Sequence, residues 1–168
     1  VYQNVEEMLE VEDAGVLISA RLRLADGFLE IGESERAREH AMGVHDLSLE
    51  LSEHQLHARS RVILGRYYAR TKDSELSLLH YNAALETFSE EANPTNAVET
   101  EMLLGQVLVD VGRTSEASEH YLDALSIAEA NDFRLLQAEI LARLGTIRGD
   151  RSETVSYTHL RAHETGWY

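Results

Sequence analysis

Three arginines on one predicted helix are the side chains best placed to bind a ligand. Arg59, Arg66 and Arg70 are separated by seven and four residues, so in an α-helix they lie along one stripe. A guanidinium binds a carboxylate through two parallel hydrogen bonds, which suits an acidic peptide or a chain terminus. The alternative is that the arginines pair with carboxylates on neighbouring helices, such as Asp26 or Glu99. The sequence leaves both interpretations open.

Histidines are the other candidates for chemistry, as pH sensors or metal ligands. His40, His80 and His120 recur every forty residues, and His54 lies three residues before His57. Equivalent residues on successive packed helix pairs stand about 10 Å apart, which is too far to share one ion. His54 and His57 lack a clear third ligand. We therefore expect structural roles for these histidines, and we predict no metal and no cofactor.

No catalytic motif accompanies these residues. The sequence contains no glycine-rich phosphate loop, nucleophile elbow or zinc-binding helix motif. Its acidic residues are scattered over predicted helix surfaces, where a solvated face is the default. We therefore predict that this chain is not an enzyme.

The overall charge and composition limit the classes of partner and the cellular compartment that we expect. The 168 residues carry a formal net charge of −15, and such a chain is repelled by phosphate backbones and anionic lipid. Nucleic acid and membrane are therefore not expected as direct partners. No apolar stretch approaches the roughly 20 residues that cross a bilayer. The chain has no cysteine, which favours a reducing compartment, and a cytoplasmic location is predicted.

A forty-residue repeat supplies the elements that must position these side chains. A leucine followed by a small residue recurs at Leu24-Ala25, Leu64-Gly65, Leu104-Gly105 and Leu144-Gly145. Each unit reads as two helices with apolar residues at helical spacing, joined by a short polar or glycine-containing turn. The scarcity of proline favours long helices, because only Pro94 interrupts the chain.

Each recurring residue type has an expected structural role. Gly65 and Gly105 are expected where paired helices approach closely, together with buried alanines at Ala84 and Ala124 on the second helices. The aromatic residues expected to fill the wider space between units are Tyr68, Tyr81 and Tyr121. The turns are expected to supply helix N-caps at Ser34, Ser74 and Thr114-Ser115.

This pattern resembles the tetratricopeptide repeat (TPR). In the third unit the matching residues are Leu104, Gly105, Leu108, Gly112, Ala117, Tyr121 and Ala124, and in the second they are Leu64, Gly65, Tyr68, Ser77, Tyr81 and Ala84. The likeness extends over residues 13–149. A forty-residue period exceeds the usual 34 and resembles a subclass of signalling scaffolds and bacterial regulators. The family's frequent tryptophan is replaced by Arg21, Arg61, Glu101 and Leu141.

The resemblance implies an all-α fold, an α-α superhelix or TPR-like solenoid of antiparallel helix pairs. We expect the second helix of a preceding repeat at 1–12, repeats at 13–52, 53–92 and 93–132, and the first helix of a truncated fourth repeat at 133–154. Residues Val155 to Thr165 resemble a translated sequencing adapter. Residues 155–168 are therefore interpreted as a non-native tail, the alternative being a divergent cap.

The resemblance also implies where the array binds. Arg59 and Arg66 hold family positions that line the concave groove. The residues expected to contact a peptide or helix there are Leu22, Asp26, Arg59, Val62, Arg66, Arg70, Met102 and Gln106. The predicted function is a protein–protein interaction module whose partner is a protein or a peptide with acidic groups. The alternative is a sensor or regulatory segment of a larger bacterial signalling protein, a transcriptional regulator or a nucleotide-messenger cyclase, whose effector domain is missing.

Overall fold

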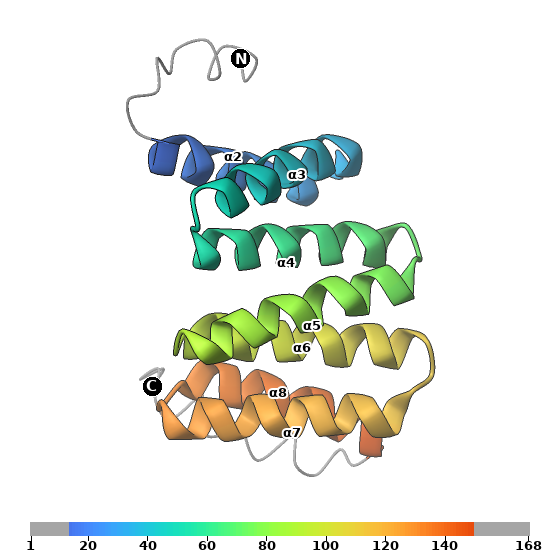
Figure 1. Cartoon of the computed structure of the whole chain (residues 1–168). Helices are drawn as coiled ribbons and strands as arrows, with labels where there is room; N and C mark the ends of the chain where they lie inside the picture. Colours follow the sequence, from blue (N-terminus) through green and yellow to red (C-terminus); the bar gives the residue numbers. More distant parts are fainter. Residues whose placement is uncertain (1–13, 150–168) are drawn as a thin grey trace, which may run out of the picture. The chain divides into compact units, whose positions relative to one another are not determined.

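The computed structural model describes residues 14–149, and every regular element in that range is an α-helix (Figure 1). The helices are α2 (Ala14–Glu30), α3 (Ser34–Glu50), α4 (His54–Arg70), α5 (Ser74–Glu90), α6 (Pro94–Asp110), α7 (Thr114–Ala130) and α8 (Arg134–Arg148). The expected preceding helix at 1–12 and the suspected tail at 155–168 lie outside the described residues. No helix within 14–149 is both long enough and apolar enough to cross a membrane.

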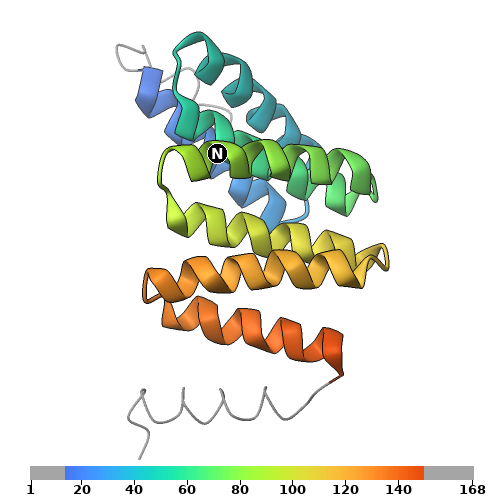
Figure 2. The same ribbon diagram turned by 60° about the horizontal axis from the view of Figure 1, so that its bottom comes forward.

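The helices follow one another at a constant spacing. A new helix begins every twenty residues, at 14, 34, 54, 74, 94, 114 and 134. The chain forms two compact units, unit 1 up to His80 and unit 2 from Tyr81. In unit 1, α3 packs against both α2 and α4, and in unit 2, α7 packs against both α6 and α8 (Figure 2). The predicted all-α, TPR-like solenoid of helix pairs is therefore confirmed, whereas the division into repeats stays an interpretation.

Each helix from α2 to α7 ends in the same backbone turn. The residue that leaves the helix has positive φ at Gly32, Ser52, Lys72, Ala92, Gly112 and Asp132. The next amide then donates to the carbonyl five residues earlier, as from Glu33 to Phe28 at 2.9 Å and from Arg113 to Leu108 at 2.8 Å. These hydrogen bonds use backbone carbonyls that would otherwise have no partner at the helix end. Because the same turn recurs, every connection between helices has the same length.

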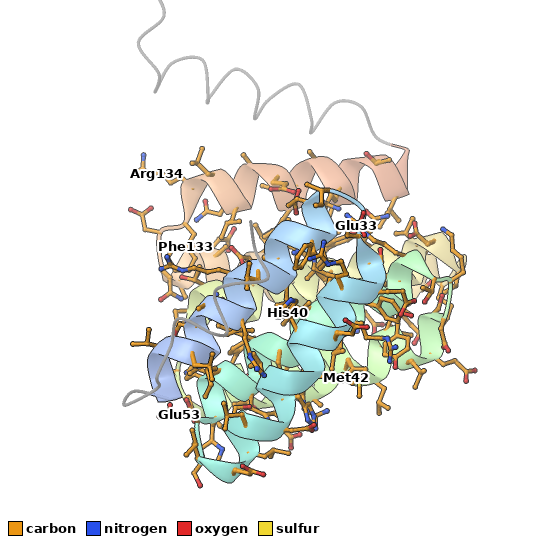
Figure 3. All side chains as sticks on the ribbon, turned by 90° about the horizontal axis from the view of Figure 1, so that it is seen from above. Glu33, His40, Met42, Glu53, Phe133 and Arg134 are labelled. Carbon is orange, nitrogen blue, oxygen red and sulfur yellow. The ribbon has the colours of Figure 1, made fainter. Side chains whose placement is uncertain are left out.

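The helix N-caps lie one residue earlier than expected. The predicted caps at Ser34, Ser74 and Thr114-Ser115 are wrong, because Ser34, Ser74 and Thr114 are already the first helical residues. The Asp73 carboxylate accepts a hydrogen bond from the Leu76 amide at 3.1 Å instead. Glu33 and Glu53 take the corresponding positions at the starts of α3 and α4 (Figure 3) without a side-chain cap. Only one residue separates the residue with positive φ from the first helical residue, and that single residue occupies the N-cap position.

The left-handed turn residues lead to a stability prediction. Ala92 has φ 51°, a conformation in which a Cβ atom approaches the following carbonyl oxygen. We expect Ala92→Gly to raise the free energy of unfolding by about 0.5–1 kcal/mol, after allowing for the larger entropy of unfolded glycine. Gly112 has φ 79°, and no atom lies within 4 Å of an added Cβ. Gly112→Ala should therefore lower the free energy of unfolding by a similar amount. Thermal unfolding followed by circular dichroism measures both, and shifts of the same sign would contradict the explanation.

Small residues allow close helix contacts in both units. In unit 2, a Cβ atom added to Gly105 would lie 2.7 Å from the Tyr121 ring, which confirms the close approach predicted there. Arg143 of α8 also lies close enough to Tyr121 to affect its pKa, so this ring has neighbours on both α6 and α8. In unit 1, the Ser77 hydroxyl donates to the buried Gly65 carbonyl at 2.9 Å. The core of unit 1 consists of Ile18, Leu22, Ala25, Phe28, Leu29, Ala37, Ala41, Val44, Ile63 and Leu64.

Candidate functional site

α4 is the most cationic of the described helices. It contains the four arginines Arg59, Arg61, Arg66 and Arg70 and no aspartate or glutamate. By contrast, α5 and α7 contain neither lysine nor arginine. In a chain with a net charge of −15, positive charge is therefore concentrated on one element of unit 1. Arg59, Arg66 and Arg70 form the arginine stripe of α4.

The arginine stripe contacts α2. The Arg66 guanidinium donates to the Asp26 carboxylate at 3.1 Å and to the Glu30 carboxylate at 2.8 Å. Arg70 donates to the backbone carbonyl of Leu29. The expectation that Arg66 pairs with Asp26 is therefore confirmed, and Glu30 is a second partner that the sequence interpretation missed.

Asp26 is a partly buried counter-ion for this arginine. Burial raises the pKa of its carboxyl group, and Glu30 raises it further, while the charges of Arg66 and Arg59 lower it without cancelling the effect. Arg59 is exposed, and among residues 14–149 it forms no ion pair. The surface thus contains one guanidinium without an ion pair, Arg59, and one that is shared between two carboxylates, Arg66.

In unit 2, Gln106 belongs to a separate polar network. Its amide nitrogen donates to the Asp110 carboxylate at 2.9 Å, and its amide oxygen accepts from Arg143 at 2.8 Å. Arg143 also donates to Glu139 at 2.8 Å. Burial lowers the pKa of Arg143, but its hydrogen bond to Glu139 and its interaction with Tyr121 outweigh this and raise the pKa. Gln106 is therefore fixed in orientation by two charged neighbours.

The predicted groove residues differ in accessibility. Leu22 is fully buried in the core of unit 1, and Met102 in unit 2 is only 7% exposed. Both contribute packing rather than open surface. The accessible members on α2 and α4 are Asp26, Arg59, Val62, Arg66 and Arg70. Gln106 is partly exposed on α6 of unit 2.

Two polar partners were missed by the sequence interpretation. Glu30 lies four residues after Asp26, so helical spacing alone places both carboxylates on one face of α2. Arg143 lies thirty-seven residues after Gln106, three short of the repeat period. Its contact therefore depends on how α8 crosses its neighbours, which the sequence period does not specify.

The periodic histidines pack against aromatic or acidic side chains. The rings of His40 and Phe28 stack at 5.3 Å between centroids, and those of His80 and Tyr68 do the same. His120 instead bonds to Glu101 in unit 2. These contacts give each histidine a structural role. Within residues 14–149, no group of three or more His, Cys, Asp or Glu side chains is arranged to hold a metal ion.

The fold is shared with several solved structures, although no protein-family model and no curated protein matches the sequence. BtubC from P. vanneervenii aligns with a TM-score of 0.72 and 17% identity, over 96% of this chain and 70% of that one. The apo form of RapI aligns with a TM-score of 0.77 and 17% identity, over 90% of this chain and 57% of that one.

A third structure is that of the Rap conjugation gene regulator of plasmid pLS20, in complex with a Phr peptide. It aligns with a TM-score of 0.66 and 17% identity, over 84% of this chain and 40% of that one. This chain thus spans about half the length of RapI and less than half of the plasmid regulator. At such low identity the likeness concerns the fold, and the described chain is a TPR-like helical-repeat solenoid.

Proposed function

We propose that this chain is a protein-interaction module and that the arginine stripe of α4 binds an acidic peptide segment, whose carboxylates compete with Asp26 of α2 for Arg66. The observation that carries the proposal is a helix with four arginines and no carboxylate in a strongly acidic chain. A structure of similar fold has a peptide bound, which supports this class of partner. Binding of this kind requires no catalytic group in the chain.

The local charges explain how an acidic ligand gains access. Carboxylates of the peptide pair with exposed Arg59 and replace Asp26 and Glu30 around Arg66. Arg66 stays paired with carboxylates in the exchange, and the released Glu30 side chain is 70% exposed, so water can solvate it. Arginine holds a carboxylate through two hydrogen bonds, which adds orientation to the charge attraction. Affinity is therefore expected to fall as the salt concentration rises.

Selection from a displayed library of short random peptides tests the proposal. We expect the selected peptides to be rich in Asp and Glu, and we expect synthetic copies with Asn and Gln to bind at least about tenfold more weakly. Fluorescence anisotropy at low and high salt measures both effects. Selection of uncharged peptides whose affinity is independent of salt would refute an arginine-based site.

Substitutions in the arginine stripe and at Asp26 are expected to change peptide affinity in opposite directions. Arg59→Glu/Arg66→Glu should weaken the binding of a selected acidic peptide by at least about tenfold. Asp26→Asn should strengthen it by about threefold to tenfold, because it removes an internal competitor for Arg66. The matched control is Arg36→Glu/Arg38→Glu on α3, which changes the net charge equally; Arg36 covers the Phe28 ring and Arg38 bonds to Glu35. Equal losses in both double variants would indicate a net-charge effect and would refute a localised site.

A second candidate is that the chain is the ligand-sensing segment of a larger regulator. The observation in its favour is that this chain covers only 40% of the peptide-bound plasmid regulator and 57% of RapI. The sequence of the full gene tests it. An adjoining DNA-binding or catalytic domain would support regulation, whereas helical repeats throughout would support a scaffold.

A further inference from the structure

Four cationic or titratable side chains meet on the other side of α4 from the arginine stripe. This histidine–arginine cluster consists of His45 on α3, His57 and Arg61 on α4, and His80 on α5, all in unit 1. The Arg61 Nε group donates to His57 Nε2 at 2.8 Å. The His45 and His57 rings lie 4.3 Å apart between centroids. These contacts join α3 to α4, and His80 of α5 lies near enough for the charges of Arg61 and His45 to act on it.

The centre of the cluster is nearly closed to solvent. The His57 side chain is only 8% exposed, and Nδ1 of His80 is buried without a hydrogen-bond partner. The Arg61 charge acts on both rings, and His54 also acts on His57. Asp46 lies 3.4 Å from His45, but its side chain is 77% exposed. A positive charge on His57 would thus be buried beside other cations.

The hydrogen bond between Arg61 and His57 requires the neutral ring. A guanidinium can only donate, so His57 Nε2 must offer its lone pair. A proton on that atom would place two N–H donors against each other at 2.8 Å. Burial, His45 and Arg61 together lower the pKa of His57 to about 4, against a weaker opposing effect of the His45 backbone. Burial, Arg61 and His45 also lower the pKa of His80.

The same helix positions in unit 2 have the opposite charge arrangement. Glu101 and His120 lie forty residues after Arg61 and His80, respectively. The carboxylate of Glu101 and Nδ1 of His120 lie 2.6 Å apart, and this contact raises the pKa of His120 despite burial. Proton uptake is therefore opposed in unit 1 and favoured in unit 2.

We propose that the junction of α3, α4 and the beginning of α5 is an acid-sensitive joint, which opens when His57 takes up a proton and loses its bond to Arg61. Opening exposes His57 to water and separates its charge from those of Arg61 and His45. The junction of α6 and α7 in unit 2, which corresponds by position to that of α4 and α5, stays closed, because Glu101 compensates the charge on His120. The joint is independent of peptide binding.

The expected pH window follows from proton linkage. An exposed histidine titrates near pH 6.5, whereas His57 in the closed joint titrates near pH 4. Between these two pH values, His57 binds a proton in the open form but not in the closed form. The closed form therefore loses stability relative to the open form as the pH falls from about 6.5 towards 4. Between pH 7.5 and pH 5 the open population should rise by about thirtyfold.

Hydrogen exchange of the full chain at pH 7.5 and pH 5 tests the joint, after correction for intrinsic exchange rates. Amides of α3 and α4 should lose protection by about tenfold to thirtyfold, while those of α6 and α7 should keep or gain it. In proton NMR, His57 should remain neutral in the closed form to below pH 5. Equal changes in both regions, or titration of His57 near pH 6.5 without opening, would overturn the proposal.

Three variants distinguish the effect of protonating His57 from a general sensitivity of the chain to acid. His57→Leu keeps a buried apolar group and should abolish the acid-induced loss of protection in α3 and α4. Arg61→Glu gives unit 1 the charge arrangement of unit 2, so it should abolish or reverse the loss. The matched control is His54→Gln, at an exposed position on the same helix; His54 has the weakest effect on His57, so most of the response should remain. A response that survives both His57→Leu and Arg61→Glu would refute the joint.

Discussion

Gly105→Val is expected to lower the free energy of unfolding by about 3 kcal/mol, because the site has no room for a side chain. The first added carbon alone would lie 2.7, 2.8 and 3.0 Å from three atoms of the Tyr121 ring. Tyr121 is 1% exposed, so the ring is surrounded by packed atoms and cannot swing away without displacing them. α6 and α7 must therefore move apart.

Chemical denaturation followed by circular dichroism measures this loss, with Gly27→Val as the matched control. Gly27 lies within α2, and nothing approaches within 4 Å of a Cβ atom added there. Its substitution should change the free energy of unfolding by no more than about 0.5 kcal/mol. Adding Tyr121→Leu to Gly105→Val should recover part of the loss, since neighbouring sites couple. Equal losses at the two glycines would show that ring contact is not the cause.

The close helix approach at Gly105 was predictable because small residues recur with a fixed period, whereas the ring that lies there was not: Tyr121 was expected in the wider space between units and instead lies against Gly105. A buried glycine or alanine at the same point of each unit indicates a close helix approach whatever the details of the turns. The all-α solenoid of helix pairs follows from this regularity and from helical spacing of apolar residues. These signals depend on residue size and polarity, which the sequence states directly.

The turns were less predictable because their residues do not match their conformations. Lys72 and Asp132 adopt positive φ where glycine is the usual choice. Serine and threonine in the connecting turns suggested N-caps. The backbone turn instead places Ser34 and Ser74 inside their helices. The repeated helix packing determines the conformation of each connection and overrides the local preference.

The candidate site was partly predictable for a similar reason. The pairing of Arg66 with Asp26 follows from equivalent positions on successive first helices. The histidine–arginine cluster does not, because His45 and His57 come from helices whose facing sides are set by the crossing of α3 and α4. Burial then changes the chemistry of His57 in a way that residue spacing does not reveal.

Glu101→Gln is expected to lower the free energy of unfolding by about 2 kcal/mol at pH 6. The Glu101 side chain is 8% exposed and His120 is 28% exposed, with 2.6 Å between the carboxylate and Nδ1. Glutamine keeps the shape and can still form a hydrogen bond, but it cannot compensate the charge of a protonated imidazole. The substitution therefore removes the charge interaction and little of the packing.

The pH dependence of that loss identifies its origin. Hydrogen bonding to Glu101 raises the pKa of His120 in the folded chain above the value near 6.5 of an exposed histidine. The stabilisation is therefore complete below about pH 6.5 and disappears as the pH rises through the higher folded value. Denaturation from pH 6 to pH 9 should show the difference between the two proteins shrinking. Glu99→Gln, at an exposed position on the same helix, should have little effect at any pH. A loss at Glu101 that stays constant from pH 6 to pH 9 would mean that the neutral hydrogen bond, and not the ion pair, holds α6 to α7.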